Sequence, residues 1–393
     1  MSEEIKNVQE ELNDQMQIRR DKLAEYEADG IYPFGQRFVV KDHAKDIKND
    51  FLNYEDQPVV IAGRLMTMRS HGKTAFANVR DLSGDIQVYF RKDVLGEDNY
   101  KYVKMLDIGD IVGIEGHVFR THSGEVTIKV DKLTLLSKAL RPLPEKWHGL
   151  KDTELRYRQR YVDLIVNPEV RDTFVKRSKI VAKIREYMMN DGFMEVETPM
   201  MHPIPGGAAA RPFITHHNAL DIDIYMRIAP ELYLKRLIVG GMERVFEMNR
   251  CFRNEGIDNR HNPEFTTIES YQAYGDVEDA IRLTENLVSY CAQEVLGTQE
   301  ITYQGTEINL TPPWNRITMA EGVKKYTGED FDAVTTVEEA RAIADRLNVE
   351  YTNNDGIGKI LNACFEDYVE DNLIQPTIVY GHPKDISPLA NAS

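Results

Sequence analysis

The chain has 393 residues, of which 42% are hydrophobic and 28% are charged, with a formal net charge of −16. This composition is typical of a globular protein with a sizeable core, and the length allows two or three domains. The net negative charge argues against a general affinity for nucleic acid, so an RNA ligand would need local basic patches.

Three further features bear on the cellular compartment in which we expect the protein. The first residues, MSEEIKNVQEE, are polar and acidic, unlike a secretory signal, and no apolar run approaches the roughly 18 residues of a membrane-spanning helix. The cysteines Cys251, Cys291 and Cys364 lie far apart and form no CxxC pair. We therefore expect no disulfide framework, no zinc cluster and no membrane contact, and a reducing cytoplasm as the location.

Residues 3–29 are predicted to form one helix with a thin apolar stripe, ended by Gly30 and Pro33. Residues 57–136 then contain five short alternating or β-branched runs separated by glycines, which predicts a small barrel of the OB-fold type. OB-folds stack unpaired bases on aromatic side chains. From composition alone, Phe76 fits such a stacking platform and an ordinary core position equally well.

Residues 138–167 are predicted to be a linker, interrupted by prolines and rich in arginine. A long helix over 168–191 follows, and residues 193–199 form a short strand closed by proline. The helix is predicted to bury one apolar stripe: Val175, Ile180, Val181, Ile184, Tyr187 and Met188.

Two further segments carry candidate site residues. The glycine-rich stretch 205–213 lacks the Gly-Lys-Ser/Thr of a P-loop, so it is not a Walker site. Glu231 begins a predicted helix that is entered through Pro230, a position that the helix dipole alone favours for an acid.

Residues 244–276 are predicted to form an antiparallel hairpin with a long polar tip over 256–263. The tip and its flanks hold Arg253, Glu255, Arg260, His261 and Phe265. Guanidinium and imidazole groups suit a polyphosphate, and an aromatic ring suits a stacked base. The alternative is a structural hairpin with a solvated charged tip, but long tips are often functional.

The string FRNE, followed by RHNPEFT and by Glu269 and Tyr271, resembles motif 2 of the class II aminoacyl-tRNA synthetases in its lysyl-tRNA synthetase form. GKTAFANVRDLSGDIQVYF is similar to the anticodon-binding domain of the lysyl-, aspartyl- and asparaginyl-tRNA synthetases, and YRQRYVDLI is characteristic of the same group. Residues 168–199 resemble motif 1, which forms the dimer interface of class II enzymes.

This resemblance implies an α+β fold. An N-terminal helix and extension (1–54) would precede an OB-fold anticodon-binding β-barrel (55–137), a linker (138–167) and a class II catalytic domain (168–393). The catalytic domain is expected to be an antiparallel β-sheet flanked by helices. Nothing in the chain resembles the third class II motif, so we expect a catalytic domain that is incomplete, a chain truncated before that motif, and little lysine-dependent activity.

The implied function is a lysine–tRNA ligase: ATP-dependent activation of L-lysine to lysyl-adenylate and its transfer to tRNA(Lys). The implied enzyme is a cytoplasmic homodimer joined through motif 1, and Mg²⁺ bridges the phosphates of ATP. Its metal ligands are not identified.

The resemblance also assigns residues, with Arg253 as the catalytic residue. The ATP-binding residues are Arg253, Glu255, Arg260, His261 and Phe265. The lysine-binding residues are Gly207, Glu231, Arg253, Glu255, Glu269 and Tyr271. The tRNA anticodon-binding residues are Arg69, Phe76, Gln87 and Glu125.

Two alternatives stay open. An aspartyl- or asparaginyl-type synthetase shares the same motifs, but a pocket with Glu231 and Glu269 suits a cationic substrate and suits aspartate badly. A non-catalytic tRNA-binding paralogue or fragment would account for the missing third motif.

Overall fold

The computed structural model describes residues 3–144, 150–258 and 261–387. The chain forms two compact units, Met1–Arg171 and Asp172–Ser393. Within the described residues, no helix combines the length and the apolar character that crossing a membrane requires.

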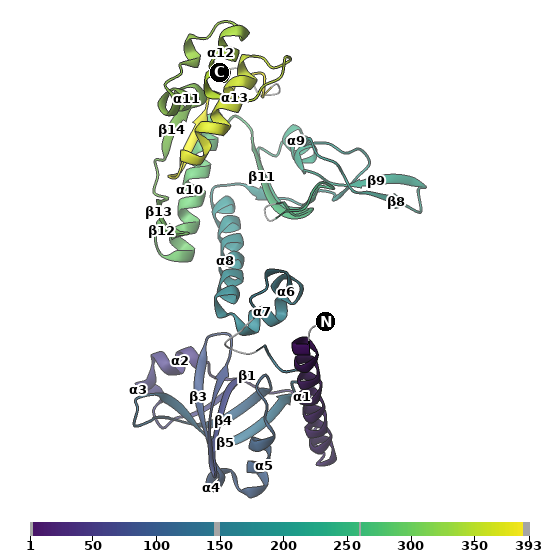
Figure 1. Cartoon of the computed structure of the whole chain (residues 1–393), viewed down its shortest axis with the longest axis vertical. Coiled ribbons are helices and arrows are strands. Elements are labelled where there is room, and N and C mark those ends of the chain that lie inside the picture. The colour runs from purple at the N-terminus through teal and green to yellow at the C-terminus, as the bar shows by residue number, and fades with distance from the viewer. Residues whose placement is uncertain (1–2, 145–149, 259–260, 388–393) are drawn as a thin grey trace. The chain divides into compact units, whose positions relative to one another are not determined.

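The first unit is built on a closed five-stranded barrel with the strand order β1-β2-β3-β5-β4 (Figure 1). Its strands confirm the five predicted runs: β1 (Pro58–His71), β2 (Thr74–Arg80), β3 (Asp85–Arg91), β4 (Ile111–Arg120) and β5 (Val126–Ser137). Neighbouring strands are antiparallel except for β3 and β5, whose parallel pairing closes the barrel.

Alternation along the strands separates the barrel core from its outer face. In β2 and β3 every second residue is buried, including Ala77 and Val88, while the residues between them are half-buried. Phe76 belongs to the half-buried set, as do Gln87 and Tyr89. The alternative in which Phe76 is a barrel core residue is therefore wrong.

The N-terminal helix α1 (Glu3–Ala28) packs on the barrel through Tyr26, which belongs to the buried apolar core of the unit, and through polar contacts. Arg19 is 8% exposed, and its Nη1 donates hydrogen bonds to the carbonyl oxygens of Ile108, Ala139 and Arg141 at 3.2, 3.0 and 3.2 Å. Four short helices complete this part of the unit: α2 (Ala44–Asn49), α3 (Phe51–Tyr54), α4 (Lys92–Leu95) and α5 (Glu97–Met105).

The predicted linker contains two short helices that the sequence analysis did not anticipate, α6 (Thr153–Arg158) and α7 (Arg160–Val166). Asp163 explains them, because its buried carboxylate accepts hydrogen bonds from Arg156, Arg160 and Asn167. Of the two arginines of YRQRYVDLI, Arg160 thus binds this acid, while Arg158 pairs with Glu154.

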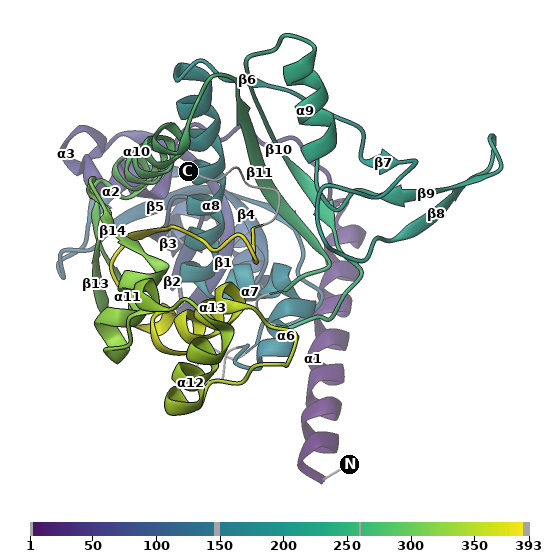
Figure 2. The ribbon, with the colours of Figure 1, turned by 90° about the horizontal axis from the view of Figure 1, so that it is seen from above.

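The second unit contains the predicted hairpin, β10 (Arg244–Phe252) and β11 (Glu264–Gln272), whose long strands run side by side in Figure 2. The short strand β6 (Met194–Glu195) pairs with β10 in parallel. A second small sheet has the order β7-β9-β8, made of β7 (Met201–His202), β8 (Ile214–His217) and β9 (Ile222–Met226). Helix α9 (Glu231–Val239) lies between that sheet and β10 in the sequence.

One face of the hairpin is covered by helices α8 (Pro168–Asn190) and α10 (Val277–Leu296). Phe246 and Met188 are buried there, and Ile268 of β11 packs against them. The predicted buried stripe of α8 is only partly correct. Its second half packs on the hairpin, but Val175 and Ile180 are each 39% exposed.

The rest of the second unit has its own apolar core. A hairpin, β12 (Glu300–Tyr303) and β13 (Thr306–Asn309), is followed by a parallel pair, β14 (Asn315–Thr318) and β15 (Thr377–Tyr380). Between β14 and β15 lie three helices, whose buried residues form one cluster: α11 (Met319–Thr327), α12 (Val337–Leu347) and α13 (Ile357–Tyr368). Short 3-10 turns at Phe331–Ala333 and Glu370–Asn372 complete this part.

Candidate active site and nucleic-acid interface

The face of the β10–β11 hairpin opposite Phe246 and Ile268 gathers most of the predicted catalytic residues. The register sets Cys251 opposite Phe265 and Glu247 opposite Glu269. Directly opposed residues of an antiparallel pair project to the same side of the sheet, and side chains two residues apart share a face. Phe265, Glu269 and Tyr271 therefore line one face along β11.

Arg253 continues this face just beyond β10, where its backbone N–H donates a hydrogen bond of 2.9 Å to the carbonyl oxygen of Pro263. Its guanidinium carbon lies 5.1 Å from the ring centroid of Phe265, a cation–π distance. Arg253 Nε is buried and has no hydrogen-bond partner in the described part of the chain. This buried donor is therefore available to an acceptor on a bound ligand or water.

The hairpin tip positions His261 through a residue that the sequence analysis missed. Asp258 accepts two hydrogen bonds of 2.7 Å, one from the backbone N–H of His261 and one involving its Nδ1. The spacing Asp-x-x-His is a signal that could have found this contact. Arg260, also predicted to bind phosphate, lies outside the described residues.

Glu255 joins the tip to the glycine-rich segment. The Asn254 N–H donates to the Arg211 carbonyl oxygen at 2.7 Å, and the Arg211 N–H donates to Glu255 Oε1 at 3.2 Å. Gly207, in the same segment, has φ +90, and a Cβ there would lie 3.1 Å from Glu231 Cβ. The segment therefore packs closely on the first residue of α9, and Gly207 suits both the backbone conformation and the close approach.

The predicted lysine end of the site is acidic. Tyr271 Oη donates a hydrogen bond of 3.2 Å to Glu269 Oε2. Burial raises the pKa of Glu269, and the nearby carboxylates Glu231 and Glu247 raise it further, while the Tyr271 hydrogen bond and the charge of Arg227 lower it. Burial also raises the pKa of Tyr271. Glu231 itself is paired with Lys235 at 2.7 Å, one helical turn away.

A buried ion pair lies on the same strand face, and sequence reasoning did not find it. Arg227 is 1% exposed, and its Nη1 donates to Glu247 Oε1 at 2.6 Å while its Nε donates to the Arg250 carbonyl oxygen at 2.8 Å. The Thr198 hydroxyl donates to Glu247 Oε2 at 2.6 Å. These contacts pair the Glu247 carboxylate with a cation. The neighbouring Glu269 carboxylate forms no ion pair among the described residues and accepts a hydrogen bond from Tyr271.

In the first unit, a cavity of about 670 Å³ on the outer face of the barrel brings together three of the four predicted anticodon residues, Arg69, Phe76 and Gln87. Arg69 and Phe76 are directly opposed across β1 and β2. Phe76 stacks on Tyr89 with ring centroids 4.3 Å apart, which holds its ring in place. Glu125 is exposed, does not line this cavity and is paired with Lys48 at 3.1 Å.

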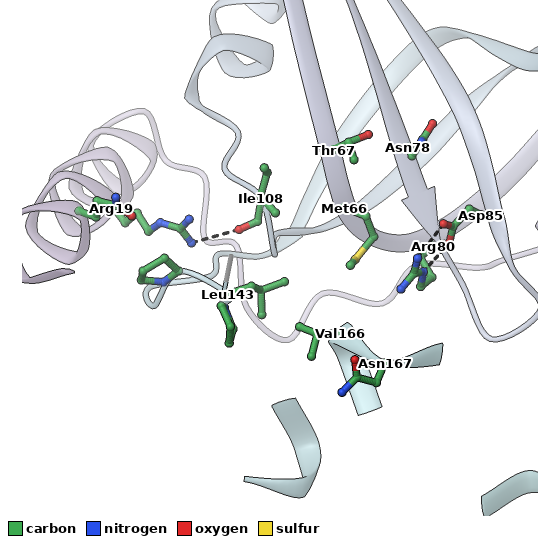
Figure 3. A pocket seen from close by; sticks show the side chains of 13 residues that line it. Arg19, Met66, Thr67, Asn78, Arg80, Asp85, Ile108, Leu143, Val166 and Asn167 are labelled. Atoms are coloured by element: carbon green, nitrogen blue, oxygen red, sulfur yellow. Dashed lines mark hydrogen bonds and ion pairs between the residues drawn. The ribbon is translucent and has the colours of Figure 1, made fainter. Parts of the chain in front are cut away.

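A second cavity of about 540 Å³ in the same unit shares the wall formed by Thr67 and Asn78 (Figure 3). Two arginines line it, but both are engaged. Arg19 donates to backbone carbonyls, and Arg80 donates to both carboxylate oxygens of Asp85. The cavity therefore offers no free cation for a phosphate.

For a metal ion, the donor set of the described residues is poor. Within residues 3–144, 150–258 and 261–387, no three His, Cys, Asp or Glu side chains cluster in a way that could hold one. A magnesium ion bound mainly by substrate phosphates would need fewer protein ligands than that.

Comparison with known proteins agrees with this geometry. The family model described as tRNA synthetases class II (D, K and N) matches residues 152–393, and the one described as OB-fold nucleic acid binding domain matches residues 59–136. The lysine–tRNA ligase of Syntrophomonas wolfei is 58% identical over 373 residues, which cover 95% of this chain and 76% of that protein. The lysine–tRNA ligase of Thermoanaerobacter pseudethanolicus is 56% identical over 390 residues, covering 99% and 78%. That of Bacillus thuringiensis is 54% identical over 388 residues, covering 97% and 78%. The chain belongs to the class II tRNA synthetases of the D, K and N group.

Proposed function

We propose that the protein is a lysine–tRNA ligase, which activates L-lysine with ATP to lysyl-adenylate and transfers the lysyl group to tRNA(Lys). The observation that carries this proposal is the single face of the β10–β11 hairpin that presents Arg253, Phe265 and Glu269 together. The names and high identities of the relatives support lysine as the substrate.

The charge of the pocket favours lysine over the other substrates of the D, K and N group. Glu269 and Glu231 come from β11 and from the start of α9, and the charge of Glu231 raises the cost of ionising Glu269. A cationic substrate relieves this repulsion, while aspartate would add a further anion. Lys235 holds Glu231 in the ligand-free protein and must yield if the substrate ammonium binds there.

In the proposed reaction, a carboxylate oxygen of lysine attacks the α-phosphorus of ATP and pyrophosphate leaves. A ribose hydroxyl at the 3′ end of the tRNA then attacks the lysyl carbonyl carbon, and AMP leaves. Such transfers depend on positioning and on charge neutralisation. Arg253 offsets the negative charge between carboxylate and α-phosphate, and Phe265 stacks on adenine. His261 and Arg260 reach the distal phosphates from the tip, and Glu255 belongs to the same cluster at the nucleotide end of the site.

Mg²⁺ would enter bound to the phosphates of ATP and would offset their charge. The described residues supply no three-ligand cluster for it, so no step above depends on a protein-held metal. Glu231 and Glu269 are assigned to the amino acid.

The other partners follow from the first unit and from α8. The 670 Å³ cavity with Arg69, Phe76 and Gln87 would hold unpaired anticodon bases, with Glu125 at its margin. The exposed apolar residues Phe174, Val175 and Ile180 of α8 suit a self-complementary interface in a homodimer. Sedimentation as a monomer at micromolar concentration would contradict the dimer. We place the enzyme in the cytoplasm, where tRNA is charged.

The test is amino-acid-dependent ATP–pyrophosphate exchange, measured on the protein at the full length that its gene encodes. We expect lysine to stimulate exchange, and aspartate and asparagine to give only background. Stimulation by aspartate or asparagine would assign the protein to another branch of the group. Anticodon-arm binding without exchange by any amino acid would indicate a non-catalytic tRNA-binding protein.

A further inference from the structure

Thr127 is a buried polar residue that neither the family assignment nor the proposed site uses. It is 0% exposed, although its neighbours Val126 and Ile128 are the ones that fill the barrel core. Its side chain belongs to the outer face, because it is the direct parallel partner of Gln87. A hydroxyl at full burial on that face must be held by hydrogen bonds.

The Thr127 hydroxyl has two acceptors within reach. Its Oγ1 lies 2.8 Å from Gln87 Oε1 and 3.2 Å from the carbonyl oxygen of Glu125. A hydroxyl has one proton to donate, and the shorter contact is with Gln87. The carboxamide oxygen of Gln87 is therefore occupied by Thr127. Gln87 Nε2 donates no hydrogen bond to any residue in the described part of the chain. Gln87 lines the cavity beside Phe76.

We propose that Thr127 is a positioning residue that fixes the orientation of the Gln87 amide, so that Gln87 presents its N–H₂ group to a nucleobase stacked on Phe76 and selects uracil over cytosine. The inference rests on the proposed binding of anticodon bases in this cavity. It adds the residue that holds the Gln87 amide in one orientation.

The chemistry of the two pyrimidines makes this orientation decisive. Uracil carries a carbonyl oxygen at C4, an acceptor for Gln87 Nε2–H, whereas cytosine carries an amino group there. When Thr127 donates its hydrogen bond to Oε1, the Nε2–H₂ group of Gln87 faces the cavity. If cytosine is bound, this donor meets the amino group of the base, which is also a donor. If the amide were reversed, Oε1 would face the cavity and would favour cytosine. A carboxamide that is free to rotate could bind either base. Discrimination between uracil and cytosine therefore depends on the hydrogen bond that fixes Oε1.

Threonine and valine have nearly the same shape and both suit a β-strand, so Thr127→Val removes the hydroxyl with little change in packing. Thr127→Ser keeps the hydroxyl and loses only a methyl group. The two variants thus separate the hydrogen bond from the packing. Phe76→Ala is the reference for loss of stacking, which should weaken every stem-loop alike.

The experiment measures the binding of unmodified anticodon stem-loop RNAs to the full-length protein. The parent RNA carries the anticodon UUU, complementary to the lysine codon AAA, and three others carry a single U→C change. For the wild type we expect one position at which cytosine weakens binding about tenfold, the size of effect that one buried hydrogen bond gives. In Thr127→Val we expect this ratio to fall to about twofold or less, with binding of the parent RNA nearly retained. Thr127→Ser should restore the ratio.

Each other outcome is decisive. The inference is overturned if Thr127→Val unfolds at the same temperature as the wild type and keeps the same ratio of affinities for the uracil and cytosine RNAs. The proposal that this cavity binds the anticodon would not be affected by that result. Equal weakening for all four RNAs also overturns the inference, because it would show a merely structural role, as would a preference for cytosine in the wild type. Failure of the wild type to bind any stem-loop would instead overturn the proposed RNA-binding function.

Discussion

The Tyr271 hydroxyl donates a 3.2 Å hydrogen bond to Glu269, and both side chains project from the same face of β11. Burial raises the pKa of Glu269, so the pocket holds an acid whose ionised form is costly until a cation arrives. This relationship links the substrate charge to the stability of the empty site, and three predictions rest on it.

Glu269→Gln should abolish most lysine binding without unfolding the protein. Loss of a charge-assisted hydrogen bond to the substrate ammonium is expected to raise the KM for lysine about 10- to 100-fold in pyrophosphate exchange. Glu264→Gln on the same strand is the matched control, since its side chain is 54% exposed and faces Arg250 at 3.5 Å. An unchanged KM in Glu269→Gln would remove Glu269 from the lysine pocket.

The same substitution gives a stability prediction with a definite sign. Because the folded pKa of Glu269 is raised, its ionisation destabilises the folded state as the pH rises through that pKa. Ligand-free Glu269→Gln should therefore be at least as stable as the wild type at pH 8, and this advantage should vanish at a pH below the ordinary glutamate pKa. Thermal unfolding at the two pH values measures it. A loss of stability at pH 8 that disappears on acidification would contradict the assignment.

Lysine affinity should fall on acidification, with a midpoint above the usual glutamate pKa, because binding requires the carboxylate. Tyr271→Phe removes the hydrogen bond that lowers the pKa of Glu269, so the acid limb of the KM profile should move to higher pH. Calorimetric titration with lysine across the acidic range measures the midpoint. A limb that stays in place, or that moves to lower pH, would show that Glu269 is not the titrating group.

Loss of one partner of the Arg227–Glu247 ion pair should destabilise the second unit, whereas replacing both partners should not. Arg227→Met leaves the buried Glu247 carboxylate unpaired and should cost about 3–5 kcal/mol in free energy of unfolding. Arg250→Met is the control on β10, the strand that carries Glu247; its guanidinium is 46% exposed, and its loss should cost less than about 1 kcal/mol. Adding Glu247→Leu to Arg227→Met should recover most of the loss. Denaturant unfolding with equal losses at Arg227 and Arg250 would contradict this.

Phe76→Ala should weaken binding of the anticodon stem-loop by about 1–3 kcal/mol, the usual contribution of one stacked base. Tyr32→Ala is a suitable control, because this 66% exposed aromatic lines a different cavity of the same unit. Filter binding at fixed salt distinguishes them. Equal affinities of Phe76→Ala and the wild type would show that this cavity is not the anticodon site.

Gly207→Ala should impair the site locally. At φ +90 an alanine is strained, and its Cβ would press on Glu231 Cβ at 3.1 Å and Ala229 Cβ at 3.2 Å. We expect a higher KM for lysine and a loss of about 1–2 kcal/mol of stability. Gly256→Ala, where a Cβ meets nothing within 4 Å, should be tolerated. Similar effects at both glycines would contradict the proposed packing.

The sequence predicted the elements whose patterns are local. The alternation in β10 and β11 predicted the hairpin and the face that Arg253, Glu269 and Tyr271 share, and the glycine-separated runs predicted the barrel. Motif likeness is the source of the proposed residue roles, and three of the four predicted anticodon residues, Arg69, Phe76 and Gln87, line one cavity.

The rest depends on contacts that no local pattern shows. Arg227 meets Glu247 across 20 positions, and Thr127 meets Gln87 across 40, through the parallel pairing that closes the barrel. The stripe of α8 revealed an apolar face but not how much of it the same chain covers, which is why Val175 and Ile180 were predicted to be buried and are exposed.

The most direct test of the central claim is lysylation of a tRNA(Lys) transcript by the full-length protein, compared with the same transcript carrying an aspartate anticodon. We predict that ATP-dependent attachment of lysine occurs, that aspartate is not attached, and that the anticodon change lowers kcat/KM by at least about tenfold, as loss of base-specific contacts does. Attachment of aspartate in preference to lysine, or equal kcat/KM for the two transcripts, would contradict the account.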